Sequence, residues 1–411
     1  MRRIGRSRSA ERGRRGMAML VVIIAVSLMT VLVSDFMENT SVFVATGANA
    51  RDEVQAIYLA RSAVNLSRLL LVVTPSINRQ LRTFGMPNLP LWRYADMLLA
   101  AFSDPGAAGG LGMMLGADLS GAEGLGAGEG GRFSARIADE DSRINLNAAA
   151  QGRMADVVAR ELAALFAPAG YNELFEERDQ DGNFTDREMQ VRAILDWADL
   201  DNIPYGLDTG TEDSMYEMLD PPYVRRNAPF DSLEELRMVR GVDEDFWSAF
   251  VDPDPDDPEQ RVLTVWGTGR VNVNTATPMV LAALICTFAQ NQPEPACDPT
   301  SPVPGALMLA QFLVMYREAG GLLPGLGAFS SVRQFTDLVT EGVEGLVPGV
   351  PLNGSEANRY LDVESRVFSV YATGEVGCEG GGRCVRRTIH TVIHTGLTSN
   401  EGGAVLYWRE D

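Results

Sequence analysis

Acidic residues with the spacing of a calcium loop occur between residues 177 and 188. Seven residues of this stretch, four of them acidic, occupy positions 1, 3, 5, 6, 7, 9 and 12 of an EF-hand pattern: Glu177, Asp179, Asp181, Gly182, Asn183, Thr185 and Glu188. Calcium takes six to eight hard oxygen ligands, a glycine at the sharp turn and a terminal bidentate carboxylate, and this spacing can supply all three. Glutamate at the first position departs from the usual aspartate. The spacing predicts calcium, with a solvated acidic loop between two helices as the alternative.

A second acidic cluster follows around a proline-containing loop. It comprises Asp196, Asp199, Asp201, Glu212 and Asp213. Carboxylates gathered this closely repel one another unless a cation or an ion pair relieves the repulsion. Asp196 could instead cap a helix or face solvent.

Four cysteines fall into two close pairs, Cys286 with Cys297 and Cys378 with Cys384. An even number and close pairing favour two disulfides and therefore an oxidising compartment.

Two histidines, His390 and His394, follow the second cysteine pair and raise the question of zinc. The spacing C-x5-C-x5-H-x3-H is not that of a usual zinc finger. Because the histidine segment alternates as a β-strand, the preferred interpretation is a disulfide-closed hairpin with surface histidines.

The segment "RVNVNTATPMVLAAL", residues 270–284, is similar to the start of a helix-hairpin-helix element, which can place backbone amides near DNA phosphates. The chain carries 55 acidic and 35 basic residues, and its formal charge is −20. This acidity disfavours phosphate partners, so a structural helical subdomain is preferred and no nucleic-acid partner is expected. No recognisable Ser/His/Asp set, Cys/His set or phosphate loop was found, so we expect no catalysis.

Helical patterns dominate from 148 to 345 and strands follow. The clearest helical segments are 154–167, 186–199, 232–250, 277–290 and 304–320. An alternating segment around 133–137 predicts a strand before them, and residues 365–396 and 404–410 predict two hairpin strands and a final strand.

The N-terminal region combines a basic leader with an apolar run. Seven arginines precede Gly16, and no charged residue occurs from Met17 to Val33. The basic end should stay cytoplasmic while the rest is exported. The absence of proline up to Thr74 predicts one helix of about 85 Å, at 1.5 Å per residue. Its second half should bury a face against a globular body, with the apolar positions Val54, Ile57, Val64 and Leu71. Signal-peptide cleavage after "ANA" at 48–50 is disfavoured because charged residues separate it from the run.

These N-terminal features resemble a type IV pilin-like (class III) precursor. In that family a prepilin peptidase cuts after the glycine, here Gly16, and methylates the new N-terminus, here Met17. The apolar helix then remains as membrane anchor and assembly stem. The fifth residue after the cut is Val21, where most pilins carry a glutamate that meets the amine of the subunit above. The chain therefore resembles the K-type minor pseudopilin of type II secretion systems, thought to occupy the filament tip. The motifs "ILDWADLD", "SLEELRMVRGV" and "VNVNTATP" occur in the order expected for that family.

The resemblance implies an α+β fold, in which a long N-terminal helix packs on a small antiparallel sheet with a large inserted all-helical domain. It implies calcium in the insertion, with Asp199, Asp201, Glu212 and Asp213 as ligands. The implied partners are other minor pseudopilins, the prepilin peptidase and the bacterial inner membrane, which the chain would span once with its body in the periplasm.

The expected organisation has five parts. They are a leader at 1–16, a transmembrane and stem helix at 17–75, the start of the pilin-like domain with a glycine-rich loop at 76–147, the helical insertion at 148–345 and the closing strands at 346–411. Two other functions remain as alternatives. A membrane-anchored periplasmic DNA receptor would show salt-dependent DNA binding, and a calcium-dependent exported hydrolase would turn over a polymer.

Overall fold

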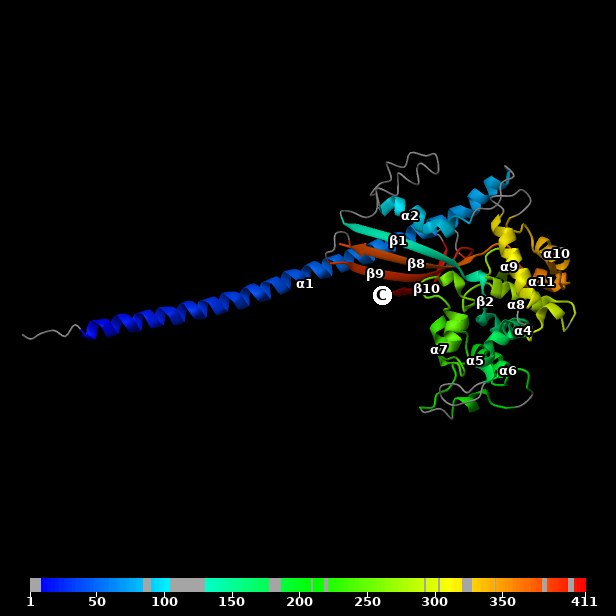
Figure 1. Ribbon diagram of the computed structural model, residues 1–411, viewed down its shortest axis with the longest axis horizontal. Coiled ribbons are helices and arrows are strands. Elements are labelled where there is room, and N and C mark those ends of the chain that lie inside the picture. The colour runs from blue at the N-terminus through cyan, green and yellow to red at the C-terminus, as the bar shows by residue number, and fades with distance from the viewer. Residues whose placement is uncertain are drawn as a thin grey trace, which may run out of the picture.

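The computed structural model describes residues 9–83, 90–103, 130–176, 186–207, 210–217, 221–291, 293–301, 304–319, 327–343, 345–378, 383–397 and 403–411. In these ranges a long N-terminal helix projects from a body that combines a four-stranded antiparallel sheet with a helical insertion (Figure 1). The predicted α+β architecture is confirmed.

Helix α1 (Ser9–Thr83) is the projecting stem. It continues through Pro75 and ends beyond residue 75, where the stem was expected to stop. Within the described ranges the apolar N-terminal part of α1 packs on no other element and is exposed, while its C-terminal part packs on the body (Figure 1). Proline removes one backbone donor, and at Pro75 the helix tolerates this near its exposed end.

The buried face of α1 is built mainly from small residues. Ala56, Ala60 and Ala63 are fully buried, together with Val64 and Leu71. These positions repeat at about 3.6 residues and form one stripe of the helix. The predictions for Val64 and Leu71 are correct, Ile57 is half-buried, and the prediction for Val54 is wrong because Val54 lies off this stripe and is 52% exposed.

The sheet has the order β1-β8-β9-β10 and all neighbouring strands are antiparallel. Its strands are β1 (Gly131–Asp139), β8 (Val367–Val376), β9 (Val385–His394) and β10 (Ala404–Glu410). Helix α1 packs against β1, β8 and β9, and α2 (Ala95–Ser103) packs against β1. A Cβ atom at Gly374 on β8 would overlap the carbonyl oxygen of Ala56. The glycine therefore permits the close approach of stem and sheet.

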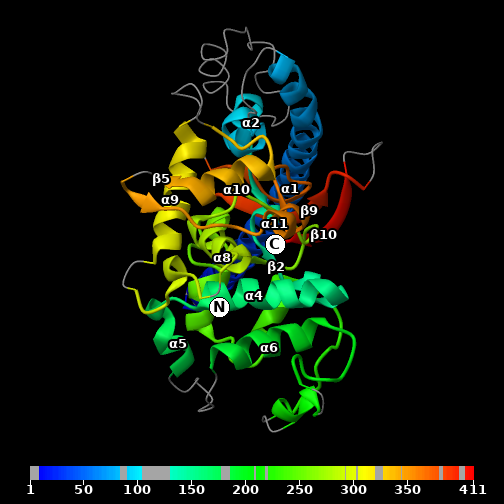
Figure 2. The same cartoon turned by 90° about the vertical axis from the view of Figure 1, so that its right-hand side faces the viewer.

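The helical insertion lies between β1 and β8 in the chain. Its helices are α4 (Ala155–Phe166), α5 (Asn172–Glu176), α6 (Arg187–Ala198), α7 (Glu244–Phe246), α8 (Pro278–Phe288), α9 (Gly305–Glu318), α10 (Val332–Glu341) and α11 (Gly354–Tyr360). Its short strands are β2 (Ile144–Asn145), β3 (Leu263–Thr264), β4 (Val271–Asn272), β5 (Gly342–Val343), β6 (Val347–Pro348) and β7 (Leu361–Asp362). Figure 2 shows α4 and α6 on the opposite side of the molecule from α2.

Four of the five predicted helical segments are confirmed as α4, α6, α8 and α9. The segment 232–250 is not one helix. It forms a 3-10 helix at Leu233–Met238, then α7, then a π-helical turn at Trp247–Val251. Gly241 adopts a φ of 80° between the two helical pieces, a left-handed conformation that ends helices.

The insertion contains an internal repeat that the sequence analysis did not detect. In "RINLN", Asn147 accepts from the Phe230 backbone N–H (2.6 Å) and donates to the carbonyls of Phe230 and Val265. In "RVNVN", Asn274 accepts from the Phe329 N–H (2.7 Å) and donates to the carbonyls of Phe329 and Val363. The strand before each asparagine pairs in parallel, β2 with β3 and β4 with β7. Two similar units therefore follow each other, and their first helices, α4 and α8, pack together.

Buried carboxylates fix the two segments that connect the sheet with the insertion. Asp141 accepts from the backbone N–H groups of Thr268 (2.9 Å) and Arg366 (2.7 Å). Glu140 pairs with Arg143 (2.6 Å), and both side chains are about 1% exposed. The segment that leaves β1 is thus fixed to the segment that enters β8.

Candidate metal centre

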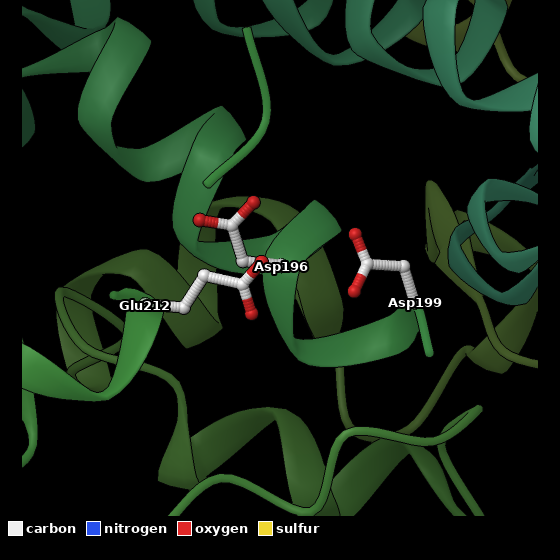
Figure 3. A group of neighbouring side chains, drawn as sticks. All are labelled: Asp196, Asp199 and Glu212. Atoms are coloured by element: carbon white, nitrogen blue, oxygen red, sulfur yellow. The ribbon is translucent and has the colours of Figure 1, made fainter. Parts of the chain in front are cut away.

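Three carboxylates of the second acidic cluster face one another in the insertion. One oxygen from each of Asp196, Asp199 and Glu212 lies within 4.8 Å of the others. Figure 3 shows the carboxylate of Asp199 directed toward those of Asp196 and Glu212. Asp196 and Glu212 are buried, and Asp199 is partly exposed.

The end of α6 and the loop after it position these groups. Asp186 caps the start of α6 by accepting from the Met189 N–H (2.7 Å). Asp196 and Asp199 are three residues apart, which places them on one face of the helix end. The Tyr205 N–H donates to Asp196 (2.7 Å) and folds the loop back over the helix, so that Glu212 arrives beside Asp196.

Arg225 is the protein's own cation at this cluster. Its buried guanidinium pairs with Glu212 and with Asp213 (3.1 Å), and it donates to the carbonyl oxygen of Asp196. One positive charge therefore faces several carboxylates, which leaves the cluster with a negative excess.

The pKa values of the three carboxyl groups reflect this excess. Burial raises the pKa of Asp196 and of Asp199 to about 6, and the nearby Asp201 adds to both shifts. Burial raises the pKa of Glu212 to about 8 although Arg225 opposes the shift. Full ionisation of the cluster consequently needs further positive charge.

The donor set fits a hard divalent cation. One oxygen of Asp199 and Oε1 of Glu212 are buried with no hydrogen-bond partner in the part of the chain that the structure describes. Unpartnered buried carboxylate oxygens are costly, and calcium prefers carboxylate and carbonyl oxygen ligands. Asp196, Asp199 and Glu212 would hold such an ion.

The remaining predicted ligands are distributed differently. Asp201 accepts from the Ile203 N–H (2.8 Å), and Asp213 pairs with Arg225, so neither belongs to the group of three. Asp196 was predicted as a member of the acidic cluster, with a helix cap or a solvent-facing position as the alternative, and it is a buried member of the group of three. Sequence reasoning also missed Arg225. Its contacts are with Glu212 and Asp213, and it follows Asp213 by 12 residues in the sequence.

Most of the predicted EF-hand loop lies outside the residues that the structure describes. Glu177, Asp179, Asp181 and Asn183 lie outside the described residues. Glu188 is described; it lies in the first turn of α6 and pairs with Arg192 (3.0 Å).

The cysteines form two disulfides in this structure. Cys286 on α8 is joined to Cys297, and Cys378 after β8 is joined to Cys384 before β9. The second bond closes the end of the β8–β9 hairpin.

His390 is not a surface histidine, which corrects that part of the prediction. Its ring stacks on Tyr371 at 4.4 Å between centroids and meets Trp266 edge to face. Burial lowers the pKa of His390 to about 4. Within the described residues, neither His390 nor His394 belongs to a group of three metal-binding side chains.

The residues of the helix-hairpin-helix-like segment serve internal contacts. Thr277 caps α8 by accepting from the Val280 N–H (3.4 Å), and the Asn274 side chain joins Phe329 to Val363. These contacts favour the structural interpretation of the segment.

The stem is the second functional element. The helical range Met17–Leu81 is long and apolar enough to cross a membrane, by length and composition. Val21 lies in its exposed apolar part, with an exposure of 65%.

The family model for type II secretion system protein K matches residues 142–250, which include the candidate metal centre. Type II secretion system protein K of Pectobacterium carotovorum subsp. carotovorum is 28% identical over 67% of this chain and 70% of its own length. The protein of the same name from Klebsiella pneumoniae is 29% identical over 67% of this chain and 70% of its length. The chain is thus similar to type II secretion system protein K in the family model at residues 142–250 and in these relatives over about two thirds of its length. The predicted resemblance to K-type minor pseudopilins is thereby confirmed.

Two further proteins are similar to this chain. The Pseudomonas aeruginosa PAO1 protein K is 26% identical over 67% of this chain and 69% of its length. A solved structure, the GspK–GspI–GspJ complex of the enterotoxigenic Escherichia coli type 2 secretion system, aligns with a TM-score of 0.45 and 19% identity, over 69% of this chain and 80% of that chain. The named relatives are secretion-system components, and the absence of catalysis stays a prediction.

Proposed function

We propose that this minor pseudopilin occupies the tip of the type II secretion pseudopilus, where it initiates or caps assembly for protein export across the outer membrane. The position of the insertion carries this proposal. It lies at the end of the molecule opposite to the apolar part of α1 (Figure 1). A body of this size beyond the stem would obstruct a subunit stacked above it.

Val21 supports the same position. A pilin-like subunit normally joins the filament when its glutamate meets the amine of the subunit above. An unpartnered carboxylate within the membrane costs about 2.5–3.5 kcal/mol on insertion scales. A subunit with valine at this position can offer its own amine downward and needs no neighbour above it.

The membrane arrangement follows from charge and cysteine chemistry. Seven arginines precede the apolar run, which favours a cytoplasmic leader and an exported body. Two disulfides suit an oxidising compartment. We infer one span of the bacterial inner membrane with the body in the periplasm, after cleavage by the prepilin peptidase between Gly16 and Met17.

The surface of α1 that the sheet leaves uncovered suits other minor pseudopilins as partners. Tyr58, Leu69 and Val72 are exposed on the part of α1 that packs on the body, at 61%, 59% and 41%. Burial of such side chains against another stem helix would contribute about 25 cal/mol per Å² of apolar area.

A photo-cross-linking residue in place of Tyr58, in the full chain assembled in cells, tests the tip position. We expect cross-links to other minor pseudopilins, and overproduction of the chain should shorten pseudopili by creating more tips. The same cross-linker at Leu346, 76% exposed on the insertion, should not join the chain to the subunits of the shaft. Longer pseudopili on overproduction, or cross-links repeated along the shaft, would refute the tip assignment and leave the family assignment intact.

The same family resemblance leads us to propose calcium as the ion of the candidate metal centre. The raised pKa values and unpartnered oxygens of Asp199 and Glu212 support it. In this role calcium would stiffen the insertion by neutralising the cluster, and it would take no part in chemistry.

A further inference from the structure

A cavity of about 680 Å³ lies where the C-terminal part of α1 meets the insertion and the sheet. The stem contributes Leu71, and the segment after it contributes Trp92 and Arg93. The insertion contributes Arg317 from the end of α9, and β8 contributes Phe368. The cavity therefore borders all three parts of the molecule.

Among the residues that the structure describes, two arginines of this cavity have no ion-pair partner. Within the described residues neither Arg93 nor Arg317 has a carboxylate oxygen within 4 Å, and the Nε atom of each is buried without a hydrogen-bond partner. Arg317 donates through Nη1 to the carbonyl oxygen of Val273 (2.9 Å), and Arg93 lies 5.5 Å from the Trp92 ring centroid. Burial and the charge of Arg93 lower the pKa of Arg317 to about 10. Two half-buried guanidinium groups that repel each other favour an anion between them.

The acidic residues of the cavity do not supply that anion. Glu318 and Glu364 line it, but both are exposed, so solvent screens their charge. Burial raises the pKa of Glu259 and the positive charge of Arg93 opposes that shift, but the two groups are too far apart to form an ion pair. A third arginine, Arg79 on α1, lies at the exposed side and adds to the positive potential.

The remaining wall is apolar. Leu71, Trp92 and Phe368 are at most 7% exposed, and the Trp92 and Phe368 rings lie 5.4 Å apart. Guanidinium groups bind carboxylates through paired N–H···O bonds. The negative charges of Glu318 and Glu364 would repel a doubly charged anion such as phosphate more strongly than a singly charged carboxylate. We propose that this cavity is a binding site for a small organic carboxylate, with its charged end between Arg93 and Arg317 and its apolar body against Leu71, Trp92 and Phe368.

Titration of the full chain in detergent with 3-phenylpropionate tests this site, with the uncharged 3-phenylpropionamide as the matched ligand. Isothermal calorimetry should show the acid binding at least about tenfold more tightly than the amide, which corresponds to about 1.4 kcal/mol. Arg317→Met and Arg93→Met should each weaken the acid about tenfold or more and leave the amide unchanged. Arg333→Met is the control, because Arg333 is 84% exposed and lies on α10 away from the cavity.

Three results would overturn the proposal. They are equal affinity for acid and amide, acid binding that both cavity variants retain, and no acid binding at millimolar concentration. The comparison of acid and amide uses the wild-type chain, so it remains decisive even if a cavity variant fails to fold. It is also independent of the filament position proposed above.

Discussion

At the scale of single residues, Asp199 is the partly exposed carboxylate of the candidate metal centre. It has a buried oxygen without a partner in the described chain, and it lies opposite Asp196 and Glu212. We expect removal of calcium by a chelator, or Asp199→Ala, to lower the melting temperature. A ligand that binds only the folded state at 100 times its Kd stabilises by about 2.7 kcal/mol.

Thermal unfolding with and without chelator measures this calcium effect. Asp245→Ala removes an exposed carboxylate of the same insertion and should melt like the wild type in both conditions. If chelation leaves the wild-type melting temperature unchanged, the calcium proposal is wrong.

Glu161 on α4 is a buried carboxyl group, with 5% of its surface exposed. Burial raises its pKa to about 8 in spite of the nearby Arg160 charge. Because the folded-state pKa exceeds the unfolded value, the folded chain holds the proton more tightly between about pH 4.5 and 8. Its stabilising contribution is complete below that window and falls as pH rises through it, by about 1.4 kcal/mol per pH unit at most.

Glu161→Gln should therefore change stability little at pH 5 and raise it relative to wild type at pH 9. Urea unfolding at both pH values measures the difference. Glu173→Gln, at an exposed position on α5, is the control and should follow the wild type. Parallel pH profiles for wild type and Glu161→Gln would contradict the assignment of a buried protonated carboxyl.

At the scale of elements, the contact between α1 and β8 depends on the absence of a side chain at Gly374. A Cβ there would overlap the Ala56 carbonyl oxygen, and the buried alanines of α1 leave no alternative space. We expect Gly374→Val to destabilise the chain by about 1–3 kcal/mol, because overpacking forces stem and sheet apart. Chemical denaturation gives the loss, and limited proteolysis reports the release of the stem.

Gly354→Ala is the matched control, since no atom lies within 4 Å of a Cβ built at that glycine. It should keep wild-type stability. A Gly374→Val protein as stable as this control would show that stem and sheet do not pack as closely as described.

Elements with long, regular apolar patterns could be predicted from the sequence. The helices α4, α6, α8 and α9 and the strands β8, β9 and β10 have such patterns. The two-residue strands β2, β3, β4 and β7 are too short for alternation to reveal, so the parallel pairs of the repeat were missed. The similar sequences "RINLN" and "RVNVN", each followed later by an F-x-S motif at 230–232 and 329–331, were the signal that could have identified the repeat.

The candidate metal centre was predictable only in part, because part of it depends on the folded chain. Sequence proximity identified Asp199 and Glu212, but burial of Asp196 depends on the folded loop through the Tyr205 N–H. Arg225 enters only through tertiary contact with Glu212 and Asp213. Local spacing therefore predicts which carboxylates lie close together. Which of them form an ion pair with an arginine depends on the folded structure.

At the scale of the whole molecule, the proposed removal of residues 1–16 as a leader can be tested directly at the N-terminus of α1. We expect the mature chain to begin at a methylated Met17, and Gly16→Val to retain the leader because a branched side chain obstructs close approach of the peptidase. Mass spectrometry of the mature N-terminus measures both. Gly47→Val, at an open position on α1, should be processed normally. A mature chain starting at Arg51 would show signal-peptidase cleavage instead.

The pairing of β1 with β8 has a consequence for the order in which the chain folds. Asp139 and Phe368 are paired neighbours, yet about 230 residues lie between them. Closing a disordered loop of that length costs about 3–4 kcal/mol more than closing a four-residue hairpin, because the entropic cost grows as the logarithm of loop length. A folded insertion already holds its two ends together through Asp141 and the Arg366 backbone, which removes most of that cost. The chain should therefore fold its insertion first, and its last 45 residues then complete the sheet against which the stem packs.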